Sequence, residues 1–242
     1  MYLYSLKIEG FRKLKNTTVY FGNSTFLIGE NNKGKSSIFK AIELVLSLKH
    51  ELTDHDYFSI FDEEIGENTY GNEGIIALTA EFRNLSENSK SWRGFKGRIF
   101  TYPSETETGF SMTYKKTFTR GSKQPSISMK RNKRIKKAQF SHAKKWNDFI
   151  CDEISQDTIT DIWGKKLDDK FKLNELDEID EVWEINEDEI EWIENPGGFS
   201  SIINNKLPKV LVIPAEDRAD EFVSKKGTLY EVLDVEVRPV SW

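Results

Sequence analysis

Residues 29–37 read Gly29-Glu30-Asn31-Asn32-Lys33-Gly34-Lys35-Ser36-Ser37, which matches the phosphate-binding pattern G-x-x-x-x-G-K-[S/T] in full. The apolar run Thr25–Ile28 precedes this loop and predicts a short strand. The segment Ser36–Leu48 follows it with apolar residues near helical spacing, which predicts an amphipathic helix. Strand, glycine loop and helix in this order are the context that the pattern requires, so a chance match is the weaker interpretation.

The residue types of the loop suit a nucleoside triphosphate. Main-chain N–H groups of the loop and of the helix N-terminus are expected to converge on the phosphates. Lys35 is expected to reach the β- and γ-phosphates, and the Ser36 hydroxyl to join the shell of a Mg²⁺ ion. The predicted nucleotide-binding residues of the loop are Gly29, Asn31, Asn32, Lys33, Gly34, Lys35, Ser36 and Ser37, with Ser36 also as the metal ligand.

The composition predicts a folded cytoplasmic domain. The chain has 242 residues, of which 31% are charged, and no apolar run approaches the roughly 20 residues of a membrane span. The N-terminus lacks the basic and apolar segments of a signal peptide. The single cysteine, Cys151, excludes an internal disulfide framework and fits a reducing compartment. The histidines show no metal-ligand spacing and receive no role: His50, His55 and His142.

Alternating side chains predict an antiparallel meander in the first half of the chain. The expected strands are Tyr2–Glu9, Thr17–Phe21, Gly74–Arg83, Arg98–Tyr102 and Phe110–Phe118, and the last three are expected to form the meander. Residues 53–72 are expected to form a polar loop with one helical turn.

The second half is expected to be mainly helical. A helix is predicted from about Asn132 to Ser155, and the acidic block from Glu175 to Glu194 is predicted to form short amphipathic helices. A short helix at Phe199–Asn205 and a buried strand at Lys209–Ile213 follow. The residues expected to be buried in the longer helix are Ile135, Trp146, Phe149 and Ile150.

Charge is distributed unevenly along the chain, although the net charge is only −5. The segment Lys130–Lys137 carries six cations in eight residues, whereas Leu173–Asn205 contains no Lys or Arg. On one helix the basic residues would give salt-sensitive affinity for DNA. Two alternatives stay open: the basic segment pairs with the acidic block, in this chain or a neighbouring subunit, or it is a solvated helix face. The candidate nucleic-acid contacts are Lys130, Arg131, Lys133, Arg134, Lys136 and Lys137.

Three stretches together resemble one family. The opening Leu6–Leu14 and the loop that follows it resemble the start of the RecF/SMC-like ABC ATPases, and the closer resemblance is to the OLD (overcoming lysogenization defect) branch with its anti-phage relatives. Residues Leu207–Arg218, which contain a strand-like run ending in Ile-Pro-Ala, are similar to the same branch. The resemblance covers about residues 1–48 and 200–220.

This resemblance implies an α/β fold: a P-loop NTPase core of the ABC type with an antiparallel β meander and a helical insertion. The expected regions are a head lobe at 1–120, a charged helical insertion at 121–198 and a return to the core at 199–242. ATP and Mg²⁺ are the implied ligands, and a homo-oligomer formed through the heads is the implied assembly. The residue that matches Arg12 lies near the nucleotide in such ATPases, where its guanidinium would offset phosphate charge; a solvent-facing Arg12 is the alternative.

The chain also departs from the family pattern. We find no signature motif, and the run Val210–Ile213 meets Pro214 and Ala215 before the acids Glu216 and Asp217, so it makes a poor Walker B strand. A second candidate, Val232–Glu236, is wrongly spaced. We therefore expect the N-terminal part of an ATPase head, without a nuclease domain, whose hydrolysis needs residues outside this chain.

Two functions fit these expectations. The first is an ATP-binding head that acts in DNA transactions or anti-phage defence, with a nuclease or toxin as a possible effector partner. The second is a regulatory scaffold that binds ATP in order to assemble with such a partner and does not hydrolyse it efficiently.

Overall fold

The computed structural model describes residues 1–47, 51–91, 95, 97–102, 109–176, 179–194 and 206–210. The chain divides into two units, Met1–Leu207 and Pro208–Trp242. In the second unit, the described residues Pro208–Val210 belong to neither a helix nor a strand. All elements described below belong to the first unit.

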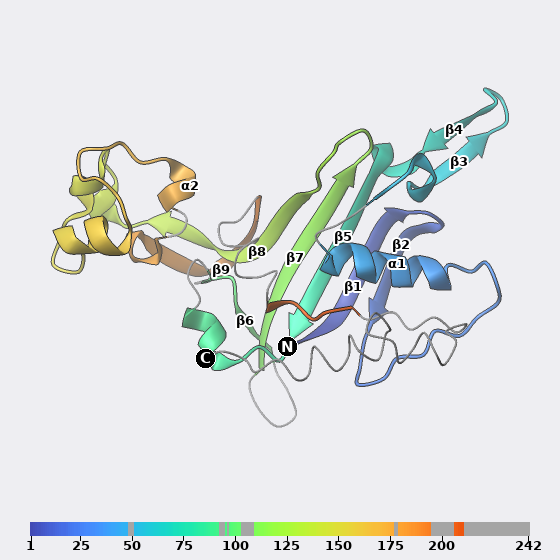
Figure 1. Cartoon of the computed structure of the whole chain (residues 1–242), viewed down its shortest axis with the longest axis horizontal. Helices are drawn as coiled ribbons and strands as arrows, with labels where there is room; N and C mark the ends of the chain where they lie inside the picture. Colours follow the sequence, from blue (N-terminus) through green and yellow to red (C-terminus); the bar gives the residue numbers. More distant parts are fainter. Residues whose placement is uncertain are drawn as a thin grey trace, which may run out of the picture. The chain divides into compact units, whose positions relative to one another are not determined.

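An antiparallel sheet organises the first unit (Figure 1). Its strands follow the order β2-β1-β5-β7-β8-β9, and β6 pairs with the start of β7. Two further strands, β3 and β4, form a separate hairpin. The strands are β1 (Tyr2–Phe11), β2 (Leu14–Tyr20), β3 (Ser59–Asp62), β4 (Glu67–Tyr70), β5 (Ile75–Arg83), β6 (Phe100–Tyr102), β7 (Gly109–Thr119), β8 (Ser126–Lys136) and β9 (Trp183–Glu194).

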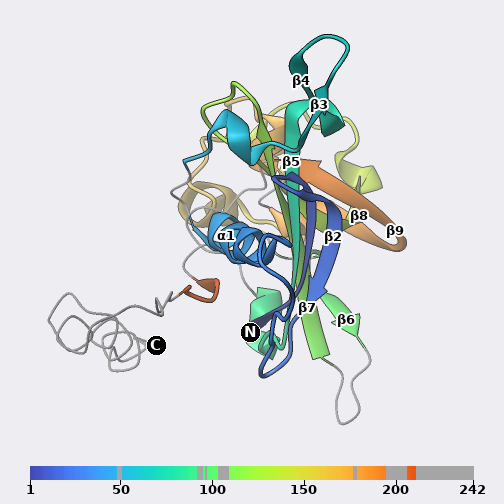
Figure 2. The same ribbon diagram turned by 90° about the vertical axis from the view of Figure 1, so that its right-hand side faces the viewer.

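Helix α1 (Lys35–Leu46) lies against one face of this sheet, as the two views in Figures 1 and 2 show. Side chains alternate between the faces of a strand, so each strand offers every second residue to the helix. In β5 these residues are Ile76, Leu78, Ala80 and Phe82, all fully buried. The main core therefore lies between α1 and the central strands, and includes Leu6, Ile8, Phe11, Ala41, Leu44, Val45, Ile76, Leu78, Ala80, Phe82, Met112, Tyr114 and Phe118.

Two polar side chains of β7 hold the C-terminal end of α1. The Tyr114 hydroxyl donates to the Val45 carbonyl, and Lys116 Nζ donates to the carbonyls of Leu44 (3.0 Å) and Ser47. Carbonyls in the last turn of a helix have no intrahelical partner, and the helix dipole favours a cation there. Because Lys116 is only 3% exposed, burial lowers the pKa of its ammonium to about 8.

The five strands predicted in the first half are confirmed as β1, β2, β5, β6 and β7 in an antiparallel sheet, and α1 is confirmed from Lys35 to Leu46. Their order differs from a simple meander, because β5 pairs directly with β7 and β6 pairs with the start of β7. The stretch predicted as a polar loop, 53–72, contains the β3–β4 hairpin. The α/β fold class is confirmed with them. The predicted strand at Thr25–Ile28 is wrong: these residues form no regular structure, and Phe26 and Ile28 are 83% and 93% exposed. No strand in the described part of the chain pairs with them, so their apolar side chains have no sheet to join.

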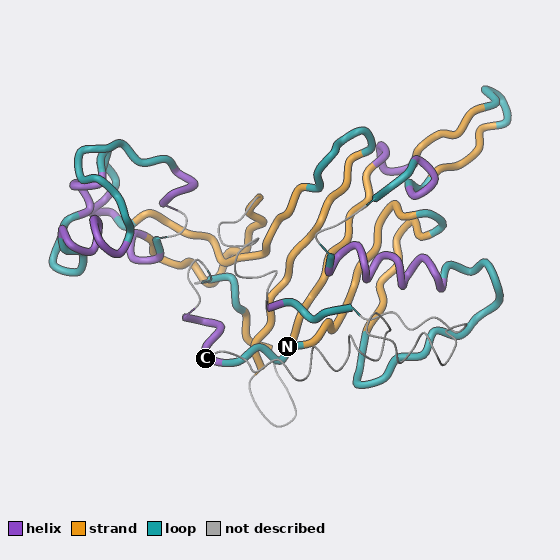
Figure 3. The backbone as a smooth tube through the Cα atoms, in the orientation of Figure 1, coloured by secondary structure: helices purple, strands orange, loops and turns teal. Residues whose placement is uncertain are grey.

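The helices predicted for the two charged segments are also wrong. The basic segment forms β8 and the acidic block forms β9, and the two strands pair from Ser128 to Lys136 (Figure 3). Arg131 Nε lies 2.8 Å from Glu191 Oε1, and Lys133 Nζ lies 2.7 Å from Glu189 Oε2. Such cross-strand contacts outweigh the helix preference of Lys, Arg and Glu.

Residues between β8 and β9 fold around a second, aromatic cluster. Trp146 lies at its centre, with its ring centroid 5.8 Å from that of Phe149 and 6.2 Å from that of Trp163. Trp146 and Phe149 are buried as predicted, whereas Ile135 and Ile150 are about half exposed, contrary to prediction. The described residues of this segment form 3₁₀ turns, a π-helical turn and one short α-helix, so the segment is not the predicted helical insertion. These elements are Ala138–Phe140, Trp146–Phe149, the π-helical turn Thr158–Ile162, α2 (Leu173–Leu176) and Asp180–Val182.

Some predictions fall outside the described residues, namely the helix at Phe199–Asn205, residues 211–213 of the late strand and the acids Glu216 and Asp217. Lys209 and Val210, which begin that strand prediction, are described and are not in a strand. None of the helices in the described ranges has the length and apolarity of a membrane span.

Burial of Lys116 predicts a pH-dependent stability. The folded pKa is below the ordinary value of the unfolded chain, so the unfolded state binds more protons above about pH 8 and the free energy of unfolding rises with pH. We expect a gain of about 2 kcal/mol from pH 7 to pH 9.5. Tyr114 limits the pH range of this gain. Burial raises the pKa of its hydroxyl, so at a pH where tyrosines of the unfolded chain ionise, the free energy of unfolding falls with pH.

Urea unfolding across this pH range measures the change, in the wild type and in Lys116→Met. The free energy of unfolding of Lys116→Met should not rise between pH 7 and pH 9.5 as that of the wild type does. Lys115→Met, on the opposite face of β7, is the control and should keep the wild-type slope. An unchanged slope in Lys116→Met would contradict this account of the buried ammonium.

Candidate functional site

A pocket of about 770 Å³ lies at the glycine loop. The loop and the start of α1 supply six of its lining residues: Asn31, Asn32, Gly34, Lys35, Ser36 and Ser37. Arg12, from the turn between β1 and β2, lines the same pocket. The structure thus brings seven of the nine predicted nucleotide-binding residues together. Gly29 and Lys33 do not line it: the Gly29 carbonyl accepts a hydrogen bond from Lys35, and Lys33 Nζ lies 3.5 Å from Glu30 Oε2.

The N-terminus of α1 faces this pocket, and this end of the helix is positively charged. Gly34 precedes the helix in a left-handed conformation (φ 94°), and no side chain caps the first turn. That turn contains no acidic residue, and Lys35 adds a cation where the helix dipole is already positive. Unpaired N–H groups and positive charge together favour a bound anion.

Lys35 is held by its own loop. Its Nζ donates to the main-chain carbonyls of Gly29 and Glu30, the latter at 2.8 Å. The ammonium is therefore within the loop and next to the first turn of α1, which is where the sequence motif requires a phosphate-binding lysine.

The first residue of β2, Leu14, supports the loop from the other side. A Cβ atom on Gly34 would lie 2.9 Å from Leu14 Cδ2, closer than carbon atoms approach without movement. Leu14 is buried in the main core. The absence of a side chain at Gly34 thus lets the loop lie directly against the start of β2.

A 3₁₀ turn at Asp54–Asp56 forms the wall that the sequence did not predict. Thr53, His55, Asp56, Tyr57 and Ser59 line the pocket, and so does Lys13. This stretch follows α1 and reads as a polar loop. Its Thr-x-x-Asp spacing resembles a capping box, which indicates a helical turn and carries no information about a pocket.

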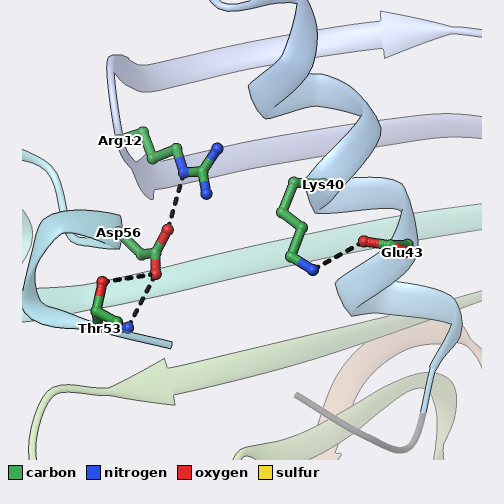
Figure 4. Close-up of polar contacts among 5 residues, drawn as sticks. All are labelled: Arg12, Lys40, Glu43, Thr53 and Asp56. Carbon is green, nitrogen blue, oxygen red and sulfur yellow. Dashed lines mark hydrogen bonds and ion pairs between the residues drawn. The ribbon is translucent and has the colours of Figure 1, made fainter. Parts of the chain in front are cut away.

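Arg12 is joined to this turn (Figure 4). Its Nε donates to Asp56 Oδ1 at 2.8 Å, and its main-chain N–H donates to the Asp56 carbonyl at 2.7 Å. Burial alone would raise the pKa of Asp56, but hydrogen bonds from Thr53 and Arg12 outweigh it and hold that pKa below its usual range. The carboxylate is therefore ionised at neutral pH and keeps its pairing with Arg12.

The pocket fits Mg²⁺ only in part. Ser36 offers a hydroxyl oxygen, and Asp56 is the only carboxylate that lines the pocket in the described part of the chain. Both Asp56 oxygens already accept hydrogen bonds. Mg²⁺ usually keeps several waters and binds one or two carboxylates plus phosphates, so Ser36 would hold it together with the phosphates and water. No group of three or more His, Cys, Asp and Glu side chains in the described ranges is placed to hold a metal.

The candidate nucleic-acid residues lie on β8 and just after it, not on a helix. Three of them form ion pairs with acids of the 175–194 block, and Lys137 Nζ lies 3.0 Å from Glu153 Oε2. Lys130 and Lys136 instead lie over aromatic rings, those of Phe100 and of Phe149 and Phe171. Of the three alternatives, the structure therefore shows the pairing of the basic segment with the acidic block of the same chain.

Comparison with known proteins points to nucleotide chemistry. Residues 1–227 match the family described as AAA ATPase domain. Three curated relatives are DNA replication and repair proteins RecF, from Rippkaea orientalis (37% identical over 71 residues), a Synechococcus strain (34% over 65) and a Picosynechococcus strain (42% over 57). These alignments cover 28%, 26% and 23% of this chain and 19%, 17% and 15% of the relatives, so the chain spans less than a fifth of their length.

A solved structure from work on "ATP-driven dimerization and DNA stimulated activation of SMC ATPases" is also similar. It is 18% identical, with a TM-score of 0.34, and the alignment covers 52% of this chain and 68% of that chain. This similarity is too weak to add to the fold described above.

The contact between Gly34 and Leu14 predicts a specific cost for a side chain in the loop. We expect Gly34→Ala to lower the free energy of unfolding by about 2–3 kcal/mol, because it adds a left-handed alanine and a steric contact. Gly121→Ala is the matched control: its φ is also positive (81°), but its Cβ would meet nothing within 4 Å, so we expect about 1 kcal/mol. Urea unfolding measures both, and equal losses would show that Leu14 does not constrain the loop.

Proposed function

We propose that this chain, which belongs to the AAA ATPase domain family, binds ATP with Mg²⁺ in the pocket at Gly29–Ser37. The family match and the RecF relatives confirm the predicted relationship to RecF/SMC-like ABC ATPase heads; membership of the OLD branch stays a prediction. The observation that carries the proposal is the uncapped N-terminus of α1, which opens into the same pocket as Lys35 and Arg12.

The chemistry of these groups suits a triphosphate. Main-chain N–H groups of the first turn of α1 would bind phosphate oxygens, and Lys35 would exchange its loop carbonyls for them. The terminal nitrogens of Arg12 would add charge-assisted hydrogen bonds from the other wall. Mg²⁺, when bound at Ser36, would neutralise phosphate charge.

Hydrolysis, we propose, needs groups from outside this chain. Asp56 is the only carboxylate among the described residues that line the pocket, and Arg12 and Thr53 already engage it. A carboxylate held in this way is a poor base for activating water. Association of two heads would supply the missing groups, and ATP would then control that association.

The biological setting that we propose is DNA processing or anti-phage defence, with a nuclease or toxin as effector partner. The RecF relatives support the DNA part of this proposal by their name, and the resemblance to the OLD branch supports the defence part. A regulatory scaffold that binds ATP without efficient turnover is the alternative, which the engaged state of Asp56 favours.

Loss of Lys35 should abolish tight binding of ATP. We expect Lys35→Ala to weaken ATP binding at least about tenfold, since it removes charge-assisted hydrogen bonds to phosphate. Lys40→Ala, on the same helix but paired with Glu43 and away from the pocket, is the matched control and should bind as the wild type does (Figure 4). Calorimetric titration with ATP measures both.

The same proteins test turnover. The purified chain should hydrolyse ATP far more slowly than an ordinary enzyme. Fast turnover by the chain alone, lost in Lys35→Ala, would contradict the proposal that groups from outside complete the site.

A DNA-binding role for β8 predicts a response to the acids that face it. The five cations of β8 pair with a strand that carries six acids, so the β8–β9 ribbon offers little net positive charge. If β8 contacts DNA, Glu189→Gln together with Glu191→Gln should raise affinity and steepen its salt dependence, because Lys133 and Arg131 become available to phosphates. The pair Lys130→Glu and Lys136→Glu should lower affinity in the same fluorescence titration. No response to either pair would exclude β8 as the contact.

A further inference from the structure

Asp56 is fixed on both sides of its carboxylate. Oδ1 accepts the hydrogen bond from Arg12 Nε at 2.8 Å, and Oδ2 accepts two from Thr53, from the main-chain N–H at 2.9 Å and from the hydroxyl at 3.1 Å. The residue is largely buried, and its side chain is 10% exposed. A carboxylate held by three donors in a buried place has one orientation, and so does the guanidinium edge that it binds.

The same turn also holds the main chain of Arg12. The Arg12 N–H donates to the Asp56 carbonyl at 2.7 Å, and the Phe58 N–H donates to the Gly10 carbonyl at 2.9 Å. Arg12 has a φ of 50°, a left-handed conformation that an arginine adopts only where its surroundings impose it. Backbone and side chain of Arg12 are thus both set by a segment that lies 44 positions away in the sequence.

The rest of the guanidinium takes no part in the hydrogen bond to Asp56. In Figure 4 only Nε of Arg12 is joined to Asp56, and neither terminal nitrogen of the guanidinium carries a drawn contact. Among the residues that the structure describes, these two nitrogens have no hydrogen-bond acceptor, and Arg12 lines the pocket with Lys35 and Ser36. A guanidinium donates from Nε and from two terminal nitrogens held in a fixed plane, whereas the three donors of a lysine all belong to one nitrogen.

We propose that Asp56 is a positioning residue, which holds Arg12 so that its terminal nitrogens face the phosphates of the bound nucleotide. The inference rests on the proposed function, because it assumes that the pocket binds a triphosphate. Asp56 acts through Arg12. It accepts the hydrogen bond from Nε and so restricts the rotation of the arginine side chain before the nucleotide binds. The N–H groups of the terminal nitrogens remain available for phosphate oxygens. A side chain that is already ordered loses less conformational entropy when the ligand binds, and the affinity is higher for that reason.

The test is a double-mutant cycle on ATP affinity. Asp56→Asn is nearly isosteric, but its amide nitrogen would face the two Thr53 donors or Arg12 Nε, so it cannot satisfy both sides. We expect Asp56→Asn to weaken ATP binding roughly three- to tenfold and Arg12→Ala by at least as much. The double variant should bind no more weakly than Arg12→Ala alone, because Asp56 has no role once Arg12 is gone.

Arg12→Lys supplies a variant that leaves Asp56 and its turn intact. A lysine keeps the charge, but its donors share one nitrogen and cannot reproduce the separate, planar donors by which Arg12 would bind Asp56 and a phosphate at the same time. ATP affinity should therefore fall nearly as far in Arg12→Lys as in Arg12→Ala. Wild-type affinity in Arg12→Lys would overturn the inference, since charge alone would then suffice.

Asp54→Asn is the matched control. Asp54 lies two residues away on the same turn, pairs with Arg120 at 2.8 Å and 2.9 Å, and does not line the pocket. Its substitution should leave ATP affinity within about twofold of the wild type, whatever it does to the melting temperature. Equal losses in Asp54→Asn and Asp56→Asn would show a general effect on the turn and overturn the inference.

The outcomes separate the two proposals. If the wild type binds ATP, Lys35→Ala does not, and Asp56→Asn binds as the wild type does, the positioning role is wrong and ATP binding stands. Additive losses in the double variant lead to the same conclusion. If the wild type binds no ATP, the proposed function fails and the positioning role fails with it.

Discussion

The attachment of α1 to the sheet determines where the phosphate-binding loop lies. Tyr114 and Lys116 bind carbonyls in the last turn of the helix, and apolar residues of α1 and β5 pack between them and the loop. The carbonyls at the C-terminal end of the helix thereby have hydrogen-bond donors inside the protein. Its N-terminal end has no side-chain cap and opens into the pocket. The contacts at the far end of the helix and in the core therefore set the direction in which its positive end points.

Predictions from local pattern were correct where neighbours in the sequence decide the structure. The alternation in β5 is such a case, because side chains two residues apart share a face. The charged segments failed for the opposite reason. Lys, Arg and Glu favour helices when each segment is taken alone, yet Arg131 and Glu191 meet across two strands although they are 60 positions apart. Local preference could not reveal a partner at that distance, and the β8–β9 pairing that this contact stabilises takes the place of the predicted helices.

The same distinction separates the two walls of the pocket. The loop could be predicted residue by residue, because the residue types and spacing of Gly34, Lys35 and Ser36 are the ones that phosphate binding requires. Asp56 could not be predicted, because nothing near it in the sequence indicates that Arg12 is its partner. The Thr25–Ile28 segment shows a further limit: an apolar run suits a buried strand, but it becomes one only where a neighbouring strand is available, and the described residues provide none.

The two acids of the 3₁₀ turn bind arginines from different parts of the sheet: Asp54 binds Arg120 at the end of β7, and Asp56 binds Arg12 between β1 and β2. Free energies of coupling are reciprocal. Whatever the turn contributes to the affinity of Arg12 for an anion, the anion contributes equally to the resistance of the turn against local opening. Amide hydrogen exchange at the main-chain N–H of Asp56 and Tyr57 would therefore slow on occupation of the pocket, although neither amide touches the ligand.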